Sequence, residues 1–162
     1  MSGPDTEKPR IEMGKAMLIA GLRSHYTAET MKDIAKQWQR FAAYLGKVPG
    51  QVGSVTYGLC LETSGLNGID YISGVEVSKS SSLPPEFSTL SIPAQTYAIF
   101  LHRGHVSNLR ETIDVIWKER LPESGHQHAC GGGSPAFFER YTQSFDPEAG
   151  MGDVEVWIPV RS

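Results

Sequence analysis

The order strand, helix, hairpin occurs twice along this chain, and this repetition limits the folds open to it. In two stretches, apolar side chains recur at spacings of three and four, which is the period of a helix with one buried face. Each stretch follows an apolar run and precedes two alternating runs joined by turn residues. The first copy comprises residues 11–22, 27–45, 54–62 and 68–78, and the second comprises 96–103, 107–121, 136–142 and 153–160.

Two such units predict an α+β fold of duplicated β-α-β-β units. The hairpins would form one antiparallel sheet, with the two main helices on one face and a central ligand groove between the halves. We expect a flexible tail over residues 1–9 and a single domain over 10–162, with pseudo-repeats at about 10–80 and 90–160. A chain of 162 residues is long enough for one domain with a sizeable core.

Charge and hydropathy exclude several classes of partner. The net charge is -3 and Lys and Arg form no block, so we expect no direct nucleic-acid binding. No apolar run approaches the roughly 20 residues of a membrane span, and the first ten residues are too polar for a secretory signal. We therefore expect no membrane partner and a cytoplasmic location. Two cysteines are too few for a disulfide scaffold, and Cys60, within an apolar strand, is predicted to be an inert buried thiol.

The second hairpin carries the side chains most suggestive of a site. Alternation places Phe137, Glu139 and Tyr141 on one face of their strand, and Glu155 and Trp157 on one face of the last strand. Combined, these acids and rings would form an aromatic cage for a cation. The alternative is that Glu139 is a solvated strand residue paired with an arginine such as Arg103 or Arg140. For Glu155, an exposed position at the rim is favoured over a ligand contact.

Other aromatic residues allow two interpretations. Trp38 and Trp117 lie on the helical stripes, where a tryptophan is either core or the wall of a site. Tyr57 and Tyr71 lie on the first hairpin and would line the other side of the groove or pack as ordinary strand residues.

A glycine-rich loop contains His126, His128 and Cys130, which are potential zinc ligands. Because no second spaced pair accompanies them, we predict no metal site. His102 and His105 flank Gly104 at a strand-to-helix turn, where a role in the turn is favoured over general-base catalysis.

Several motifs in the second half together resemble the effector-binding domain of bacterial transcription activators, the GyrI-like small-molecule-binding superfamily. The resemblance is specific over about residues 90–160 and looser over 10–80. The motifs are residues 102–106 (HRGHV), 116–122 (IWKERLP), 138–141 (FERY), 145–147 (FDP) and 154–160 (VEVWIPV).

This resemblance implies a duplicated β-α-β-β fold whose groove binds hydrophobic, often cationic ligands around a buried glutamate. The glutamate would be Glu139, and Trp117 and Trp157 would supply aromatic walls. Family members often carry an N-terminal DNA-binding module, and about ten residues precede the first predicted strand here. We therefore expect a standalone domain, for which transcriptional activation does not carry over.

The leading hypothesis is a non-enzymatic binding domain for amphipathic or cationic small molecules, without a cofactor. The expected ligand-binding residues are Glu139, Tyr141, Trp117, Trp157, Phe137, Tyr57, Tyr71 and Trp38. One alternative is a hydrolase of reactive small molecules that uses Glu139 with Tyr141. Another is a gyrase-inhibitor-like protein-interaction module, and a homodimer is left open.

Overall fold

The computed structural model describes most of the chain, in eight segments. They are residues 9–27, 29–62, 68–79, 83–102, 104–129, 135–142, 145–146 and 151–161. The predicted tail, except residue 9, lies outside the described residues.

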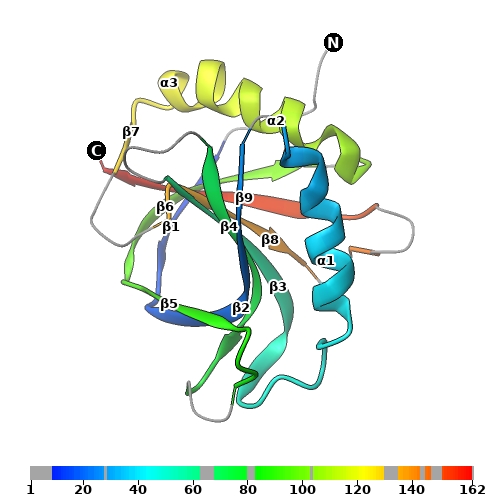
Figure 1. Ribbon diagram of the computed structural model, residues 1–162. Coiled ribbons are helices and arrows are strands. Elements are labelled where there is room, and N and C mark those ends of the chain that lie inside the picture. Colours follow the sequence, from blue (N-terminus) through cyan, green and yellow to red (C-terminus); the bar gives the residue numbers. More distant parts are fainter. Residues whose placement is uncertain are drawn as a thin grey trace.

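The described residues form one nine-stranded antiparallel sheet with helices on one side of it (Figure 1). The strand order is β1-β6-β9-β8-β3-β4-β2-β5, and β7 pairs with β9. The strands are β1 (Arg10–Gly14), β2 (Met17–Tyr26), β3 (Gln51–Glu62), β4 (Ile69–Val77), β5 (Ser88–Ile92), β6 (Gln95–His102), β7 (Gln127–His128), β8 (Phe137–Tyr141) and β9 (Val154–Arg161). The predicted α+β class with an antiparallel sheet and two main helices on one face is confirmed.

The strand order shows how the two copies meet. Leaving out β1, β5 and β7, it reads β6-β9-β8 followed by β3-β4-β2, so each half has its own first strand outermost and its hairpin within. The halves join where β3 pairs with β8, and Gly58 lies opposite Glu139 in that register. The seam between the repeats therefore runs beside the predicted central glutamate.

The sheet curls until its ends come together. β1 is at one end of the strand order and β2 is next to the other end, yet only Lys15 and Ala16 separate them. Three residue steps span at most roughly 11 Å, so the edges must approach each other there. The sheet consequently has an outer face, covered by helices, and an enclosed inner face (Figure 1).

Both helical segments pack on the outer face. The first comprises η1 (Met31–Asp33) and α1 (Ile34–Ala42). The second runs through η2 (Val106–Asn108), α2 (Leu109–Val115), a π-helical segment η3 (Ile116–Arg120) and α3 (Leu121–Glu123). Phe41 of α1 packs on Ala20 and Val75, whereas Leu109 and Ile116 pack on Phe100 and Val156. Burying each large apolar side chain contributes about 1.5–3 kcal/mol.

The inner face has a core of its own. Its buried members come from both halves, and a group of rings from β3, β6, β8 and β9 lies among them. They are Ile19, Tyr57, Leu59, Ile72, Ile92, Tyr97, Ile99 and Phe138, with Trp157 packed against them.

Three expectations about the elements were wrong, and β5 was not predicted. The apolar run 11–22 is two strands, because the chain passes from one end of the sheet to the other at Lys15 and Ala16. Gly14, just before this crossing, lies so close to the ring of Tyr97 that a side chain there would clash. β5 lies in a stretch that alternates only weakly, and β7 lies in the predicted loop. The helix passes Pro122 and ends at Glu123, with Ser124 as its C-cap, before Gly125 with φ 78°. Pro122 lies in the first turn of α3, after the π-helical segment, and proline is tolerated in a first helical turn because its missing N–H would have no partner there.

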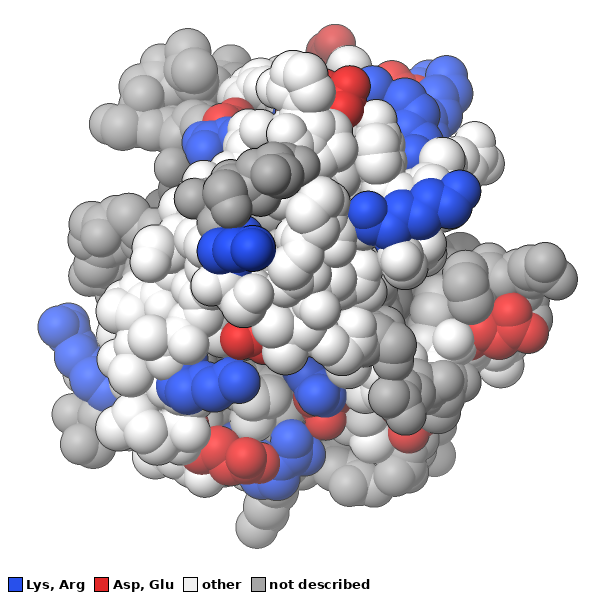
Figure 2. All heavy atoms as spheres, turned by 90° about the horizontal axis from the view of Figure 1, so that it is seen from below, with Lys and Arg blue, Asp and Glu red and all other residues white. Residues whose placement is uncertain are grey.

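No helix among the described residues is long and apolar enough to cross a membrane. Basic and acidic side chains are interspersed on the face seen in Figure 2.

Candidate functional site

Glu139 is buried on the helix-covered face of the sheet, with only 8% of its surface exposed. The hydroxyl of Tyr71 donates to Glu139 Oε1 at 2.7 Å, and the hydroxyl of Tyr141 donates to the same oxygen at 2.8 Å. The indole N–H of Trp38 donates to the Tyr71 hydroxyl at 2.9 Å. Three elements (α1, β4 and β8) thus hold one carboxylate oxygen, and Oε2 accepts no hydrogen bond from a described residue.

No cation pairs with Glu139 within the described part of the chain. Arg140, one candidate partner, lies on the opposite face and binds Glu155 at 3.0 Å; Arg103, the other, is outside the described residues. Burial raises the pKa of Glu139, although the hydrogen bonds from Tyr71 and Tyr141 act in the opposite direction. The two hydroxyl groups satisfy the hydrogen bonding of this carboxylate, but they do not neutralise its negative charge.

Gly58 makes the space for this arrangement and was not identified from the sequence. A Cβ at this position would lie 2.0 Å from the Tyr71 hydroxyl oxygen and 2.6 Å from Glu139 Oε1. The signal was a glycine within an alternating strand, which often marks a close approach. Cys60, on the same face, is buried, and desolvation followed by the charge of Glu139 raises the pKa of its thiol well above the usual value. The thiol is therefore protonated, as predicted for an inert cysteine.

Aromatic rings from both helical segments surround Glu139 and its tyrosines. Trp38 lies edge-on to Tyr141 at 5.1 Å and to Tyr71 at 6.3 Å between ring centroids. Trp117, in the π-helical segment, lies edge-on to Phe137 at 6.0 Å. Both tryptophans are partly exposed. The structure thus brings together six of the eight predicted residues: Glu139, Tyr141, Tyr71, Trp38, Phe137 and Trp117.

The other two predicted residues, Tyr57 and Trp157, lie on the inner face. Phe138 pairs with Trp157, and Arg140 pairs with both Glu155 and Tyr57 across the sheet, so all five share that face. The predicted combination of Trp157 and Glu155 with Glu139 is wrong, because Glu139 pairs instead with Val156. Alternation along each strand was correct, but the register between strands cannot be read from one strand alone.

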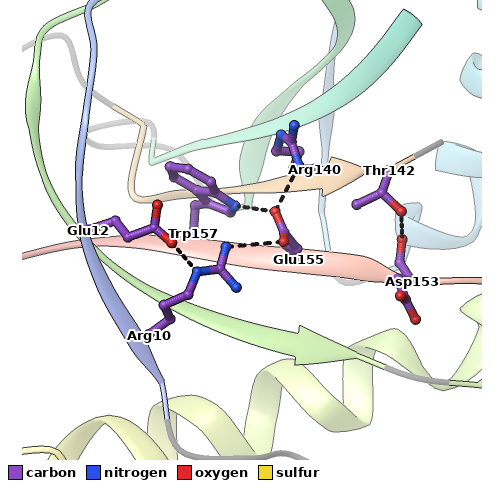
Figure 3. A network of polar contacts seen from close by, with 7 residues as sticks. All are labelled: Arg10, Glu12, Arg140, Thr142, Asp153, Glu155 and Trp157. Atoms are coloured by element: carbon purple, nitrogen blue, oxygen red, sulfur yellow. Dashed lines mark hydrogen bonds and ion pairs between the residues drawn. The ribbon is translucent and has the colours of Figure 1, made fainter. Parts of the chain in front are cut away.

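Glu155 is held by a network of its own (Figure 3). Its Oε1 accepts from Arg140 and from the indole N–H of Trp157, both at 3.0 Å, and its Oε2 accepts from Arg10 at 3.2 Å. Arg10 also pairs with Glu12. The pKa of Glu155 is lowered: burial acts to raise it, but the hydrogen bonds and arginine charges together outweigh burial.

The histidines make contacts within the fold. His102 is buried, with Nδ1 2.6 Å from the Thr112 hydroxyl and Nε2 3.0 Å from the His105 carbonyl, so it ties β6 to α2. His128 lies 2.8 Å from the Ala136 carbonyl and edge-on to Trp117. Cys130 lies outside the described residues, and no cluster of metal-ligating side chains occurs within the described ones.

The family model of the GyrI-like small molecule binding domain matches residues 7–161. The chain belongs to this family. The GyrI-like chain is also 28% identical over 153 residues to the transcriptional regulator BrlR of Pseudomonas aeruginosa. That match covers 93% of this chain and 54% of BrlR, so the chain spans about half the length of that relative.

Solved structures share the fold of this GyrI-like chain. SAV2435, solved with bound tetraphenylphosphonium, superposes with a TM-score of 0.76 at 18% identity over 96% of this chain and 95% of that one. An integron cassette protein of Vibrio cholerae superposes with a TM-score of 0.64 at 20% identity, over 96% and 97% of the two chains. At these identities the likeness establishes the fold alone.

Proposed function

We propose that this GyrI-like domain binds lipophilic cations, with Glu139 as the counter-charge. The observation that carries the proposal is the buried carboxylate of Glu139 without a cationic partner among the described residues. An ionised carboxylate in an apolar setting is costly unless a positive charge accompanies it. A ligand that brings the charge would supply that stabilisation.

The hydrogen bonds decide which part of the carboxylate a ligand would meet. Both tyrosine hydroxyls donate to Oε1, which fixes the carboxylate and favours its ionised form. Oε2 is left to face the ligand. Since Tyr71 is itself held by the indole of Trp38, the carboxylate is oriented before any ligand arrives.

The surrounding rings suit a cation that is bulky and apolar. Tyr71, Tyr141 and Trp38 contact one another around Glu139, and Phe137 and Trp117 extend the aromatic surface. Ring faces attract cations by roughly 0.5–2 kcal/mol each, depending on desolvation. A small hydrated cation such as sodium would gain little from such walls, whereas a charge buried within phenyl groups would contact them directly.

The comparison with SAV2435 is consistent with this ligand class, because that protein of the same fold was solved with tetraphenylphosphonium. A role in sequestering or sensing such compounds would follow from the binding.

The test compares tetraphenylphosphonium with the neutral triphenylphosphine oxide by isothermal titration calorimetry. We expect Glu139→Gln to weaken binding of the cation by about tenfold or more, since a close ionic contact at low dielectric is worth at least about 1.4 kcal/mol. Binding of the neutral compound should change by less than about threefold. Glu111→Gln, the same change at an exposed position of α2, is the matched control. Equal losses for both compounds would disprove the charge argument.

A separate incubation with strained or electrophilic small molecules, followed by mass spectrometry, distinguishes binding from turnover. We expect the compound to be retained intact and in stoichiometric amount. Loss of the compound with appearance of a hydrolysis product would favour the hydrolase hypothesis.

A further inference from the structure

A cavity opens on the inner face of the sheet, on the side opposite Glu139. Its volume is about 160 Å³, and Gly14, Lys15 and Met17 line it where the sheet closes on itself. Four aromatic rings form the rest of its wall: Tyr57, Tyr97, Phe138 and Trp157. The cavity therefore lies at the junction of β1 and β2, on the opposite face of the sheet from Glu139.

The four rings form a preorganised box. Phe138 and Trp157 stack at 5.4 Å with an interplanar angle of 19°. Tyr97 stands edge-on to both, at 5.4 Å and 5.1 Å, and Tyr57 stands edge-on to Phe138 at 5.7 Å. Phe138, Tyr97 and Tyr57 are buried, whereas Trp157 is partly exposed and offers its surface to the cavity. Flat walls of this kind select a flat ring.

Among the described residues, the charged side chains that line the cavity are Lys15 and Arg140. Lys15 also pairs with Glu76 at 3.5 Å, at the exposed end of the lysine. Glu155 accepts one bond from Arg140 at 3.0 Å, and Tyr57 is a second partner of this guanidinium. A guanidinium carries five N–H donors, so these contacts orient Arg140 without exhausting it. Glu155 does not line the cavity, and both of its oxygens are occupied by Arg10, Arg140 and Trp157 (Figure 3).

We propose that this inner cavity is a second binding site, which takes a small planar aromatic acid with its ring among the four aromatic side chains and its carboxylate on Arg140 and Lys15. Pockets for drug-sized ligands measure roughly 300–1,000 Å³, so a cavity of about 160 Å³ suits a smaller molecule of one or two fused rings. A guanidinium matches a carboxylate through two parallel hydrogen bonds.

This site has the opposite charge preference to the one proposed around Glu139. Glu139 and Arg140 are neighbours on β8, yet alternation points one to the outer face and the other to the inner face. The inner site rests on its own residues and does not require the proposed function to be correct.

The experiment titrates 2-naphthoate, 2-naphthamide and cyclohexanecarboxylate into the protein by calorimetry. We expect 2-naphthoate to bind at least about tenfold more tightly than either of the others, because one lacks the charge and the other lacks the ring. Arg140→Gln should weaken 2-naphthoate by about tenfold and bring it level with the amide. Arg23→Gln, the same change at an arginine that pairs with Asp70, is the control.

Thermal unfolding will show whether Arg140→Gln is folded. If it is not, a second variant still tests the proposal. Lys15 is 74% exposed at its side chain, so Lys15→Gln should keep the fold and weaken 2-naphthoate by about threefold. Absence of measurable 2-naphthoate binding to the unmodified protein would overturn the proposal. So would 2-naphthoate binding that is lost in Glu139→Gln and kept in Arg140→Gln, because the acid would then occupy the outer face.

Discussion

The second hairpin presents a carboxylate to each face of the sheet, and the two differ in what surrounds them. Glu139 on β8 faces the helices and accepts hydrogen bonds from two tyrosines. Glu155 on β9 faces inward and meets two arginines and an indole. Burial alone would raise both pKa values, but only the pKa of Glu139 is raised, while that of Glu155 is lowered.

The difference shows that satisfying a carboxylate with hydrogen bonds is not the same as neutralising it. A hydroxyl group donates a hydrogen bond but carries no positive charge, whereas a guanidinium donates hydrogen bonds and is positively charged. Glu155 is therefore a structural ion-pair centre with its charge compensated. Glu139 has hydroxyl donors but no cationic partner among the described residues, and its raised pKa follows from that difference.

The largest effect is expected from Gly58→Ala, which removes the space on which the Glu139 arrangement depends. The added methyl would lie 2.0 Å from the Tyr71 hydroxyl oxygen, so Tyr71 must move away from Glu139. Urea unfolding should show a loss of about 2–3 kcal/mol, the upper range for overpacking. The cost should be smaller when Tyr71→Phe is already present, because the clashing hydroxyl is gone. An equal cost in both backgrounds would refute this explanation.

The next largest loss of stability is expected from Glu155→Gln, which tests the difference between the two carboxylates. This change removes the anion that holds Arg10 and Arg140, and we expect a loss of about 1–2 kcal/mol at pH 7. Because the folded state lowers the pKa of Glu155, the stabilisation exists above the ordinary carboxyl pKa and is lost as the pH falls through the lowered value. Urea unfolding at a series of pH values should therefore show the penalty shrinking in acid. A penalty independent of pH would contradict the ion-pair explanation.

Glu139→Gln should raise the free energy of unfolding, in contrast to Glu155→Gln, and by a smaller amount. With a raised pKa, folded Glu139 retains its proton in a window where the unfolded chain has lost it, so ionisation costs stability as the pH rises through that window. Replacing the carboxylate by an amide that still accepts from Tyr71 and Tyr141 should stabilise the free protein at neutral pH. The gain should disappear below the ordinary carboxyl pKa, and chemical unfolding at both pH values checks this.

The sequence was sufficient for the fold because both helices and both hairpins carry clear periodicity. It was insufficient where an element depends on distant partners. β5 and β7 contribute few apolar residues and exist because β2 and β9 offer them edges. The close approach of the Tyr97 ring to Gly14, at the end of β1, comes from more than eighty residues later in the chain and is not visible in the local pattern.

For the site, alternation correctly grouped Phe137 with Glu139 and Tyr141, and the resemblance directed attention to Glu139. The register between β8 and β9 was predicted wrongly. Glu139 pairs with Val156, so Trp157, one residue further along, lies on the other face. Tyr71 could be predicted as a site residue, but its contact with Glu139 could not, because that contact crosses the seam between the two halves. Such a contact is set by the pairing of the repeats, which a single sequence does not encode locally.

The smallest effect, and the sharpest measure of how the tyrosines tune Glu139, is expected from Tyr141→Phe. The ring and its contact with Trp38 are kept, while one of the two hydrogen bonds to Oε1 is lost. Because that bond favours the charged form, its loss should raise the pKa of Glu139 further. Affinity for tetraphenylphosphonium should then change by less than about twofold at alkaline pH, where the carboxylate is ionised in both proteins. On acidification the variant should lose affinity at a higher pH than the unmodified protein. Calorimetry across the pH range measures the two midpoints, with Tyr44→Phe, outside the Glu139 cluster, as the matched control. Coincident midpoints would show that Tyr141 positions the ring surface and does not tune the charge.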